Sequence, residues 1–165
     1  MSETGWPPNE IKLLLLDVDG TLTDGGLYFT GEGQAMKRFD VHDGLGLVRL
    51  QRAGVEVVLI SADRSPIARA RAQKLSIRAV LDGCEDKGKA VRMLLEEREL
   101  DPSVALYMGD DITDLVAMAE VGHSAAPANA VATVREAADY VTTCEGGHGA
   151  VREVCDLIIT CLGKQ

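Results

Sequence analysis

Two aspartates in the segment DVDGT, which directly follows the apolar run IKLLLL, are the first residues that could carry chemistry. Asp17 and Asp19 are separated by one residue, so an extended backbone directs both carboxylates to the same side. Gly20 then allows the chain to turn sharply. A solvated Asp-Gly turn is the plain alternative, but it does not require the second aspartate. The spacing therefore favours one carboxylate as a nucleophile and the other as an acid and base.

Two further side chains suit an anionic ligand. Ser61 ends the apolar run VEVVLI, and its hydroxyl could donate to a phosphate oxygen. A helix cap is the common role of such a serine, but Ser65 and Pro66 already have the residue types of a cap and a first helical position. Lys87 begins a predicted helix, where a cation opposes the helix dipole and thus indicates an anionic partner. A solvent-exposed lysine is the alternative, and Lys89 competes for the role.

The segment GDDITD, residues 109–114, places three aspartates close together after the apolar run VALYM. Such a concentration of negative charge is costly unless a cation binds or some of the carboxylates are solvated. Asp111 is expected to cap the following helix. Asp110, with Asp114 one helical turn later, offers the oxygen ligands that Mg²⁺ prefers. Direct contact of Asp111 or Asp114 with the metal stays open.

The elements that position these residues alternate between strand and helix. Short aliphatic runs, typical of parallel strands buried on both faces, occur at 11–16, 55–60, 78–81, 104–108, 123–126 and 139–142. Helical spacing occurs between them at 44–53, 65–75, 87–98, 112–120, 130–137 and 149–162. The alternation predicts an α/β fold with a parallel central sheet, whose ligands bind beyond the carboxyl ends of the strands. All four motifs then lie on that edge.

One segment breaks the alternation. Residues 25–40 contain two short apolar stretches around Gly-Glu-Gly, which predicts a β-hairpin inserted after the first strand. No other stretch is long enough for a lid, so we expect one domain over residues 1–165. Closure of the site must then come from a small element or from another subunit, and the tail at about 145–165 is expected to reach a neighbouring site.

Composition limits the classes of partner. Hydrophobic residues make up 46% and charged residues 26% of the 165 residues, as in soluble globular proteins. A net charge of −9 disfavours nucleic acid and anionic membranes. A phosphorylated substrate stays possible if local cations compensate. The four cysteines form no CxxC pair and are expected to be reduced and mostly buried. The N-terminal segment lacks a signal pattern, so the cytoplasm is the expected location.

Charge explains why the motifs belong together. A carboxylate approaching a phosphate dianion faces a repulsion of about 4 kcal/mol per charge pair at 4 Å and an effective dielectric constant of 20. Mg²⁺ and Lys87 would offset this repulsion. Asp17 would attack phosphorus to form an aspartyl phosphate, while Asp19 protonates the leaving alkoxide and then takes a proton from the attacking water.

In this order and spacing, the four motifs resemble the haloacid dehalogenase superfamily of phosphatases. The hairpin region, the surroundings of Lys87 and the segment GGHGAVREVCDLI resemble its capless 3-deoxy-D-manno-octulosonate 8-phosphate phosphatases, from Ile11 to Leu162. The resemblance implies a Rossmann-like three-layer sandwich, a Mg²⁺ cofactor and a phosphorylated sugar acid as substrate. It also implies a homotetramer in which the hairpins associate and a neighbour's C-terminal tail helps to close the site.

The resemblance also implies roles for individual residues. Asp17 is similar to the family's nucleophile and Asp19 to its acid and base. The metal ligands would be Asp17, the backbone carbonyl of Asp19 and Asp110, while Ser61 and Lys87 hold the phosphoryl group.

Substrate contacts are expected from Arg64, His148 and Arg152. The first two lie where the sequence departs from the family. Ala62, Asp63 and Arg64 replace a Gly-Arg pair, and His148 interrupts a GGRGA pattern. A nonulosonate 9-phosphate therefore stays open as substrate.

Two interpretations from other functional classes remain open. A receiver-type signalling domain also combines an acidic cluster, a hydroxyl and a lysine on an α/β sheet, but its acidic pair and its phosphorylated aspartate lie on different strands. A catalytically silent scaffolding subunit would be expected to have lost one of the catalytic groups, and all of them are present here.

Overall fold

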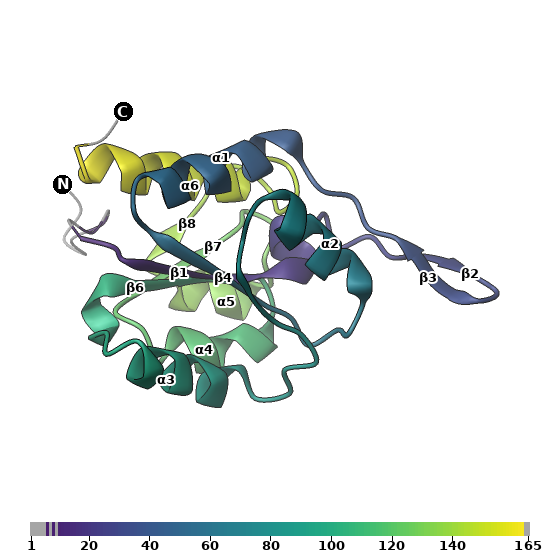
Figure 1. Cartoon of the computed structure of the whole chain (residues 1–165), viewed down its shortest axis with the longest axis horizontal. Helices are drawn as coiled ribbons and strands as arrows, with labels where there is room; N and C mark the ends of the chain where they lie inside the picture. Colours follow the sequence, from purple (N-terminus) through teal and green to yellow (C-terminus); the bar gives the residue numbers. More distant parts are fainter. Residues whose placement is uncertain (1–5, 7, 9, 164–165) are drawn as a thin grey trace.

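The computed structural model describes residues 6, 8 and 10–163, and its centre is a six-stranded parallel sheet (Figure 1). The strands lie in the order β5-β4-β1-β6-β7-β8. Their bounds are β1 Leu13–Asp17, β4 Glu56–Ile60, β5 Ala79–Leu81, β6 Ala105–Met108, β7 His123–Ala126 and β8 Tyr140–Val141. All six predicted strands are confirmed, and β1, the most apolar, lies inside the sheet between β4 and β6.

Helices cover both faces of the sheet (Figure 1). The helices are α1 Val41–Arg52, α2 Pro66–Lys74, α3 Lys87–Glu97, α4 Leu115–Met118, α5 Ala132–Ala137 and α6 Ala150–Cys161. Side chains of β1 alternate between two cores: Leu14 and Leu16 pack with residues of α1, α2 and α6, whereas Leu13 and Leu15 pack with residues of α3, α4 and α5. The predicted α/β three-layer sandwich is therefore confirmed.

Local sequence signals explain where several helices begin. The side chain of Ser65 accepts the N–H of Ile67 at the start of α2, and Pro66 is the first helical residue, as predicted. Asp111 accepts the N–H of Ile112, which confirms its predicted cap. The helix expected over 112–120 is shorter, since a tight turn at Ile112–Asp114 precedes α4. The chain turns there because Asp114 bonds back to the backbone that precedes it.

A β-hairpin projects from the body of the molecule, as predicted for 25–40 (Figure 1). Strands β2 Tyr28–Thr30 and β3 Gly33–Met36 pair antiparallel, and a bridge between Thr23 and Phe39 closes the root of the hairpin. Its large apolar side chains are half exposed or more: Leu27 51%, Tyr28 50%, Phe29 67% and Met36 60%. The hairpin thus presents an apolar surface.

The C-terminal segment differs from the prediction of a free tail. Helix α6 packs on α1 and is buried through Val151, Val154 and Ile158. Asp43 of α1 caps the start of α6 by accepting the N–H groups of Gly149 and Arg152. The prediction that the segment from Gly146 onward is free to reach another subunit is wrong for residues 146–161, because their apolar face completes this chain's own core.

Two further expectations concern cysteines and membranes. The four cysteines are free thiols: Cys84, Cys144, Cys155 and Cys161. Only Cys155 is buried, so the expectation that most of them are buried is wrong. Within the described residues, we find no helix with the length and apolar character needed to cross a bilayer.

Candidate active site

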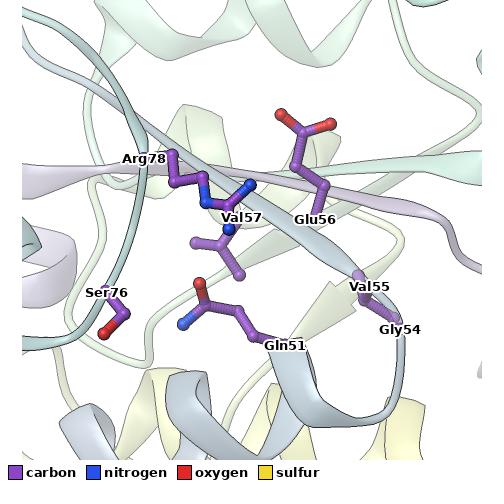
Figure 2. Close-up of a pocket in the computed structure, with 7 residues that line it drawn as sticks. All are labelled: Gln51, Gly54, Val55, Glu56, Val57, Ser76 and Arg78. Carbon is purple, nitrogen blue, oxygen red and sulfur yellow. The ribbon is translucent and has the colours of Figure 1, made fainter.

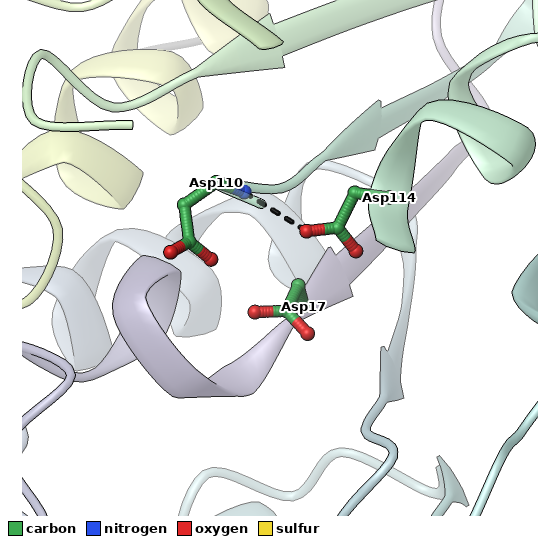
Figure 3. Close-up of side chains that lie close together, drawn as sticks. All are labelled: Asp17, Asp110 and Asp114. Atoms are coloured by element: carbon green, nitrogen blue, oxygen red, sulfur yellow. Dashed lines mark hydrogen bonds between the residues drawn. The ribbon is translucent and has the colours of Figure 1, made fainter. Parts of the chain in front are cut away.

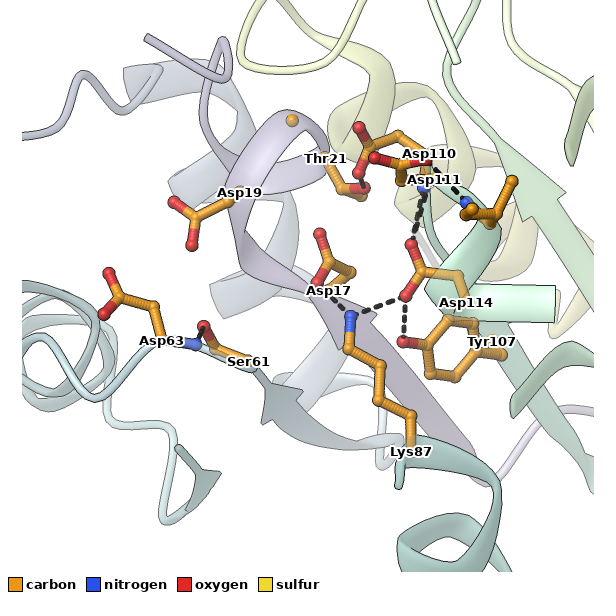
Figure 4. A network of polar contacts seen from close by, with 12 residues as sticks. Asp17, Asp19, Thr21, Ser61, Asp63, Lys87, Tyr107, Asp110, Asp111 and Asp114 are labelled. Atoms are coloured by element: carbon orange, nitrogen blue, oxygen red, sulfur yellow. Dashed lines mark hydrogen bonds and ion pairs between the residues drawn. The ribbon is translucent and has the colours of Figure 1, made fainter. Parts of the chain in front are cut away.

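The carboxyl ends of β1, β4 and β6 bring the predicted catalytic side chains to one edge of the sheet (Figure 4). Asp17 is the last residue of β1, Ser61 follows β4 and Asp110 follows β6. Lys87 is the first residue of α3, which begins after β5. The predicted common edge is therefore confirmed, because the strands are parallel and end side by side.

Lys87 lies at the centre of a buried charged cluster. Its Nζ is 2.5 Å from Oδ1 of Asp17 and 2.6 Å from Oδ1 of Asp114. Exposure of the lysine side chain is only 4%. Burial opposes its charge, but Asp17 and Asp114 outweigh this effect and raise the pKa of Lys87. The cation is therefore held ready where an anion would approach Asp17, as its unfavourable place at the helix start indicated.

Asp114 organises the loop of residues 109–114 through hydrogen bonds to both of its carboxylate oxygens. Its Oδ1 accepts hydrogen bonds from Lys87 and from the hydroxyl of Tyr107, at 2.6 Å each. Its Oδ2 accepts the backbone N–H of Asp110 at 3.0 Å (Figure 3). The same oxygen accepts the backbone N–H of Asp111 at 3.1 Å. Both oxygens are thus engaged within the protein. Asp111 is exposed and caps the turn.

The carboxylates fit a divalent cation. Asp17, Asp110 and Asp114 offer oxygens that all lie within 4.8 Å of one another. Burial, and after it the negative charge of Asp114, raise the pKa of Asp110 to about 6. The same two causes raise the pKa of Asp17 well above its usual value. One lysine does not balance three carboxylates. A cation that prefers oxygen, such as Mg²⁺, would remove the remaining repulsion.

Close packing holds the loop after β1, Val18–Leu22, against Asp110. The hydroxyl of Thr21 donates to Oδ1 of Asp110 at 3.1 Å. Gly20 has a φ of 91°, and a side chain there would overlap the Asp110 carboxylate. The glycine of DVDGT is therefore needed for both its backbone conformation and its lack of a Cβ.

Asp19 faces a different group of residues. Figure 4 shows it on the side of the loop that faces Asp63 and Ser61, away from Asp110. Its Oδ1 lies 2.7 Å from Nζ of Lys37, which also contacts Oδ2 of Asp63 at 2.8 Å. Lys37 could not be identified from the sequence, because it lies in the hairpin segment and belongs to no motif. Only the pairing of distant loops in the fold reveals it.

Ser61 is buried beside this second group. It is 1% exposed, and its Oγ accepts the N–H of Asp63 at 3.1 Å. A hydroxyl that accepts from the backbone keeps its own proton free to donate to another oxygen. This arrangement suits the predicted contact with a phosphate.

The three predicted substrate contacts lie outside this cluster. Arg64 packs over Gly83, where a Cβ would overlap its side chain, and His148 is exposed. Nε of Arg152 pairs with Asp156 on its own helix at 2.6 Å. Within the described part of the chain, none of the three is hydrogen-bonded or ion-paired with Asp17, Asp19, Ser61 or Lys87.

A cavity of about 460 Å³ lies away from these residues, at the amino ends of β4 and β5 (Figure 2). Its lining contains no predicted site residue: it consists of Gln51, Gly54, Val55, Glu56, Val57, Ser76 and Arg78. The predicted site residues therefore lie at the opposite edge of the sheet, at the carboxyl ends of the strands, and not in this cavity.

The fold and the site define a haloacid dehalogenase-like hydrolase. The family model with this description matches residues 69–154. This range contains Lys87 and the GDDITD segment, whereas DVDGT precedes it.

More specific relatives match nearly the whole chain. The 3-deoxy-D-manno-octulosonate 8-phosphate phosphatases of Yersinia pestis and Escherichia coli K12 are each 40% identical over 154 residues, covering 93% of this chain and 82% of the relative. The crystal structure of the Moraxella catarrhalis enzyme of that name, in complex with magnesium, phosphate and a KDO molecule, has 38% identity and a TM-score of 0.94, covering 99% of this chain and 94% of the other. The cobalt-bound enzyme of Haemophilus influenzae has 39% identity and a TM-score of 0.91, covering 94% and 91%. The chain belongs to this family of 3-deoxy-D-manno-octulosonate 8-phosphate phosphatases.

Proposed function

We propose that this protein is a Mg²⁺-dependent phosphatase that hydrolyses 3-deoxy-D-manno-octulosonate 8-phosphate to the free sugar acid and phosphate. One observation carries the proposal: the buried carboxylate of Asp17 lies between a fixed ammonium, Lys87, and an acidic cluster that fits Mg²⁺. The names and the bound KDO of the relatives support this sugar acid over a nonulosonate 9-phosphate.

Asp17 acts as the nucleophile in this proposal. Its carboxylate attacks phosphorus, the bond to the sugar oxygen breaks, and an aspartyl phosphate forms. Lys87 and Ser61 hold the phosphoryl oxygens. Asp17, Asp110 and the backbone carbonyl of Asp19 would hold Mg²⁺, which when bound supplies positive charge that offsets the repulsion between nucleophile and phosphate.

Asp19 moves the protons. It gives a proton to the departing alkoxide and then takes one from the water that hydrolyses the aspartyl phosphate. Its carboxylate is 31% exposed, so a substrate can reach it. By contrast, Asp17 is 5% exposed, which suits a group that must meet the phosphate with little surrounding water.

We also propose a homotetramer in which the hairpins associate. The exposed apolar side chains of β2 and β3, and their open strand edges, would be covered in a closed assembly. A neighbouring subunit would also supply a wall for the sugar acid, since the described residues form no separate lid domain that could cover Asp17. Arg64 and His148 are exposed enough to serve as substrate contacts in such a shared site. Free thiols support a cytoplasmic location.

The experiment is a screen of the purified protein with Mg²⁺ against phosphorylated sugar acids and ordinary sugar phosphates, with released phosphate measured. We expect the highest kcat/KM for 3-deoxy-D-manno-octulosonate 8-phosphate. A higher kcat/KM for a nonulosonate 9-phosphate would show that this ester is the preferred substrate. No phosphate release from any ester would reject the phosphatase activity in favour of a silent scaffold.

A further inference from the structure

A buried lysine from the hairpin root holds the acid and base residue of the proposed reaction. Lys37 directly follows β3, and its side chain is fully buried, at 0% exposure. Its Nζ lies 2.7 Å from Oδ1 and 2.9 Å from Oδ2 of Asp19. The ion pair involves both oxygens, and the hydrogen bond goes to Oδ2, so the ammonium holds the carboxylate close to the hairpin root.

Lys37 lies behind Asp19 and not beside the substrate. The carboxylates of Asp19 and Asp63 are 31% and 41% exposed, whereas the lysine between them is inaccessible. A ligand can therefore reach Asp19 without touching Lys37. Any effect of this lysine on a reaction must pass through the two carboxylates.

The same lysine connects Asp19 to the phosphate-facing loop after β4. Nζ of Lys37 donates to Oδ2 of Asp63 at 2.8 Å, and the N–H of Asp63 donates to Oγ of Ser61 at 3.1 Å. Oδ1 of Asp63 also accepts the N–H of Ser65, which ties the carboxylate to the start of α2. Asp19 is thus anchored to a rigid element of the sheet edge, although its own loop is irregular.

We propose that Lys37 is a positioning residue that orients the Asp19 carboxylate for proton transfer to the leaving oxygen. The inference rests on the proposed function. Proton transfer requires the acid within hydrogen-bond reach of the leaving oxygen, and small errors in position are costly. Lys37 resembles Lys87 in joining one aspartate of DVD to an aspartate of another loop, but Lys87 contacts the nucleophile and Lys37 the proton carrier.

Leaving-group dependence tests this role. Departure of a sugar alkoxide needs a proton, whereas p-nitrophenolate is stable enough to leave without one. The comparison uses kcat/KM, which reports steps up to release of the alcohol and so excludes hydrolysis of the aspartyl phosphate. Lys37→Met keeps the apolar stem and removes the charge. Lys12→Met, at an exposed lysine, is the matched control.

For Lys37→Met, we expect kcat/KM to fall about 100-fold on 3-deoxy-D-manno-octulosonate 8-phosphate, the order of a lost general acid, and less than about threefold on p-nitrophenyl phosphate. The Mg²⁺-induced rise in melting temperature should not change, because the acidic cluster at Asp110 makes no contact with Lys37. Asp63→Asn, which leaves the contact with Asp19, should give a smaller loss with the same dependence on the leaving group.

Equal losses on the two esters, or no loss on either, would overturn the inference. If Lys37→Met does not fold, Lys37→Arg keeps the charge but changes the shape of the donor, and a selective loss on the sugar ester is again expected. A wild-type protein that releases phosphate from neither ester contradicts the proposed function instead, so the two failures are distinguishable.

Discussion

Nζ of Lys87 lies 2.5 Å from Oδ1 of Asp17, and both side chains are almost completely buried. The ammonium is therefore already placed next to the atom that would attack phosphorus, and it needs no rearrangement when a phosphate binds. We expect Lys87→Met to lower kcat/KM at least about 100-fold, or about 2.7 kcal/mol of transition-state stabilisation. The rate of phosphate release in the presence of Mg²⁺ measures this loss of kcat/KM.

Lys89 provides the control for this substitution, because it lies in the same helical turn but is exposed. Lys89→Met should keep activity within about twofold, as expected for a surface change. The Lys87→Met protein should also melt earlier in chelator, since Asp17 and Asp114 then repel each other without a buried cation. Wild-type activity in Lys87→Met would contradict the assignment of Lys87.

The raised pKa of Asp110 predicts how pH affects metal binding. Burial and the charge of Asp114 raise the pKa of Asp110 to about 6, so protons compete with Mg²⁺ near that pH. The Mg²⁺-induced rise in melting temperature should be full near pH 8 and should be lost as the pH falls through about 6. Without metal the pH dependence is opposite. Because the pKa of Asp110 is raised in the folded state, its ionised form destabilises the protein, and stability should increase as the pH falls from about 6 to 4.

Replacement of Asp110 separates these two effects. Asp110→Asn should abolish the Mg²⁺-induced shift and the activity, while the metal-free protein melts at the same temperature or higher because one carboxylate charge is removed. Asp111→Asn is the control, since Asp111 is exposed and caps a turn. A full Mg²⁺ response in Asp110→Asn, measured by thermal melting, would remove Asp110 from the metal site.

Much of this arrangement was predictable from the sequence, for physical reasons that are local. Aliphatic runs fix the buried parallel strands, and Asp17, Ser61 and Asp110 lie at the ends of such strands or within two residues of them. Lys87 was detectable because a cation at a helix start is unfavourable without an anion. Lys37 gave no such signal, because its partners Asp19 and Asp63 come near it only when the hairpin root folds against the loops after β1 and β4.

The C-terminal segment shows a second limit. The tail that contains GGHG is expected from the sequence to be free to reach a neighbouring site, because no other segment is long enough to close the site. In the structure these glycines permit close approach instead: Gly146 packs against the backbone of Gly20, and Gly147 has a φ of 66° against the backbone of Asp24. Glycine composition alone does not distinguish these two uses.

This packing corrects the expected result of truncation. Removal of the chain from Gly146 onward would delete α6 and unfold the protein, and so it cannot test a shared site. Gly146→Ala is the sharper change, since a methyl group would overlap the carbonyl of Gly20 within the loop after β1. We expect a loss of about 1–3 kcal/mol in the free energy of unfolding, as for an overpacked site, and a loss of activity.

Gly31→Ala is the matched control, because no atom lies within 4 Å of a Cβ at that hairpin position. Urea unfolding followed by circular dichroism measures both variants. Equal stability of Gly146→Ala and Gly31→Ala would show that the GGHG segment does not pack on the loop after β1.

The exposed hairpin predicts the state of association. Phe29 is the most exposed of its apolar side chains, at 67%, so Phe29→Asp places a charge on the proposed contact without disturbing the core. We expect light scattering to give four times the chain mass for the wild-type protein and a smaller species for Phe29→Asp. A wild-type monomer at micromolar concentration with full activity would reject the tetramer and the shared site.

The central claim is that Asp17 carries the phosphoryl group, and trapping that group on the protein tests it most directly. Asp19→Asn should slow hydrolysis of the aspartyl phosphate while p-nitrophenyl phosphate, which needs no acid, still forms it. After acid quenching, mass spectrometry should find one added phosphoryl group on the peptide that contains residue 17, and none in the double variant Asp17→Asn with Asp19→Asn. A phosphoryl group on another residue, or phosphate release by Asp17→Asn above a few per cent of the wild-type rate, would contradict the account.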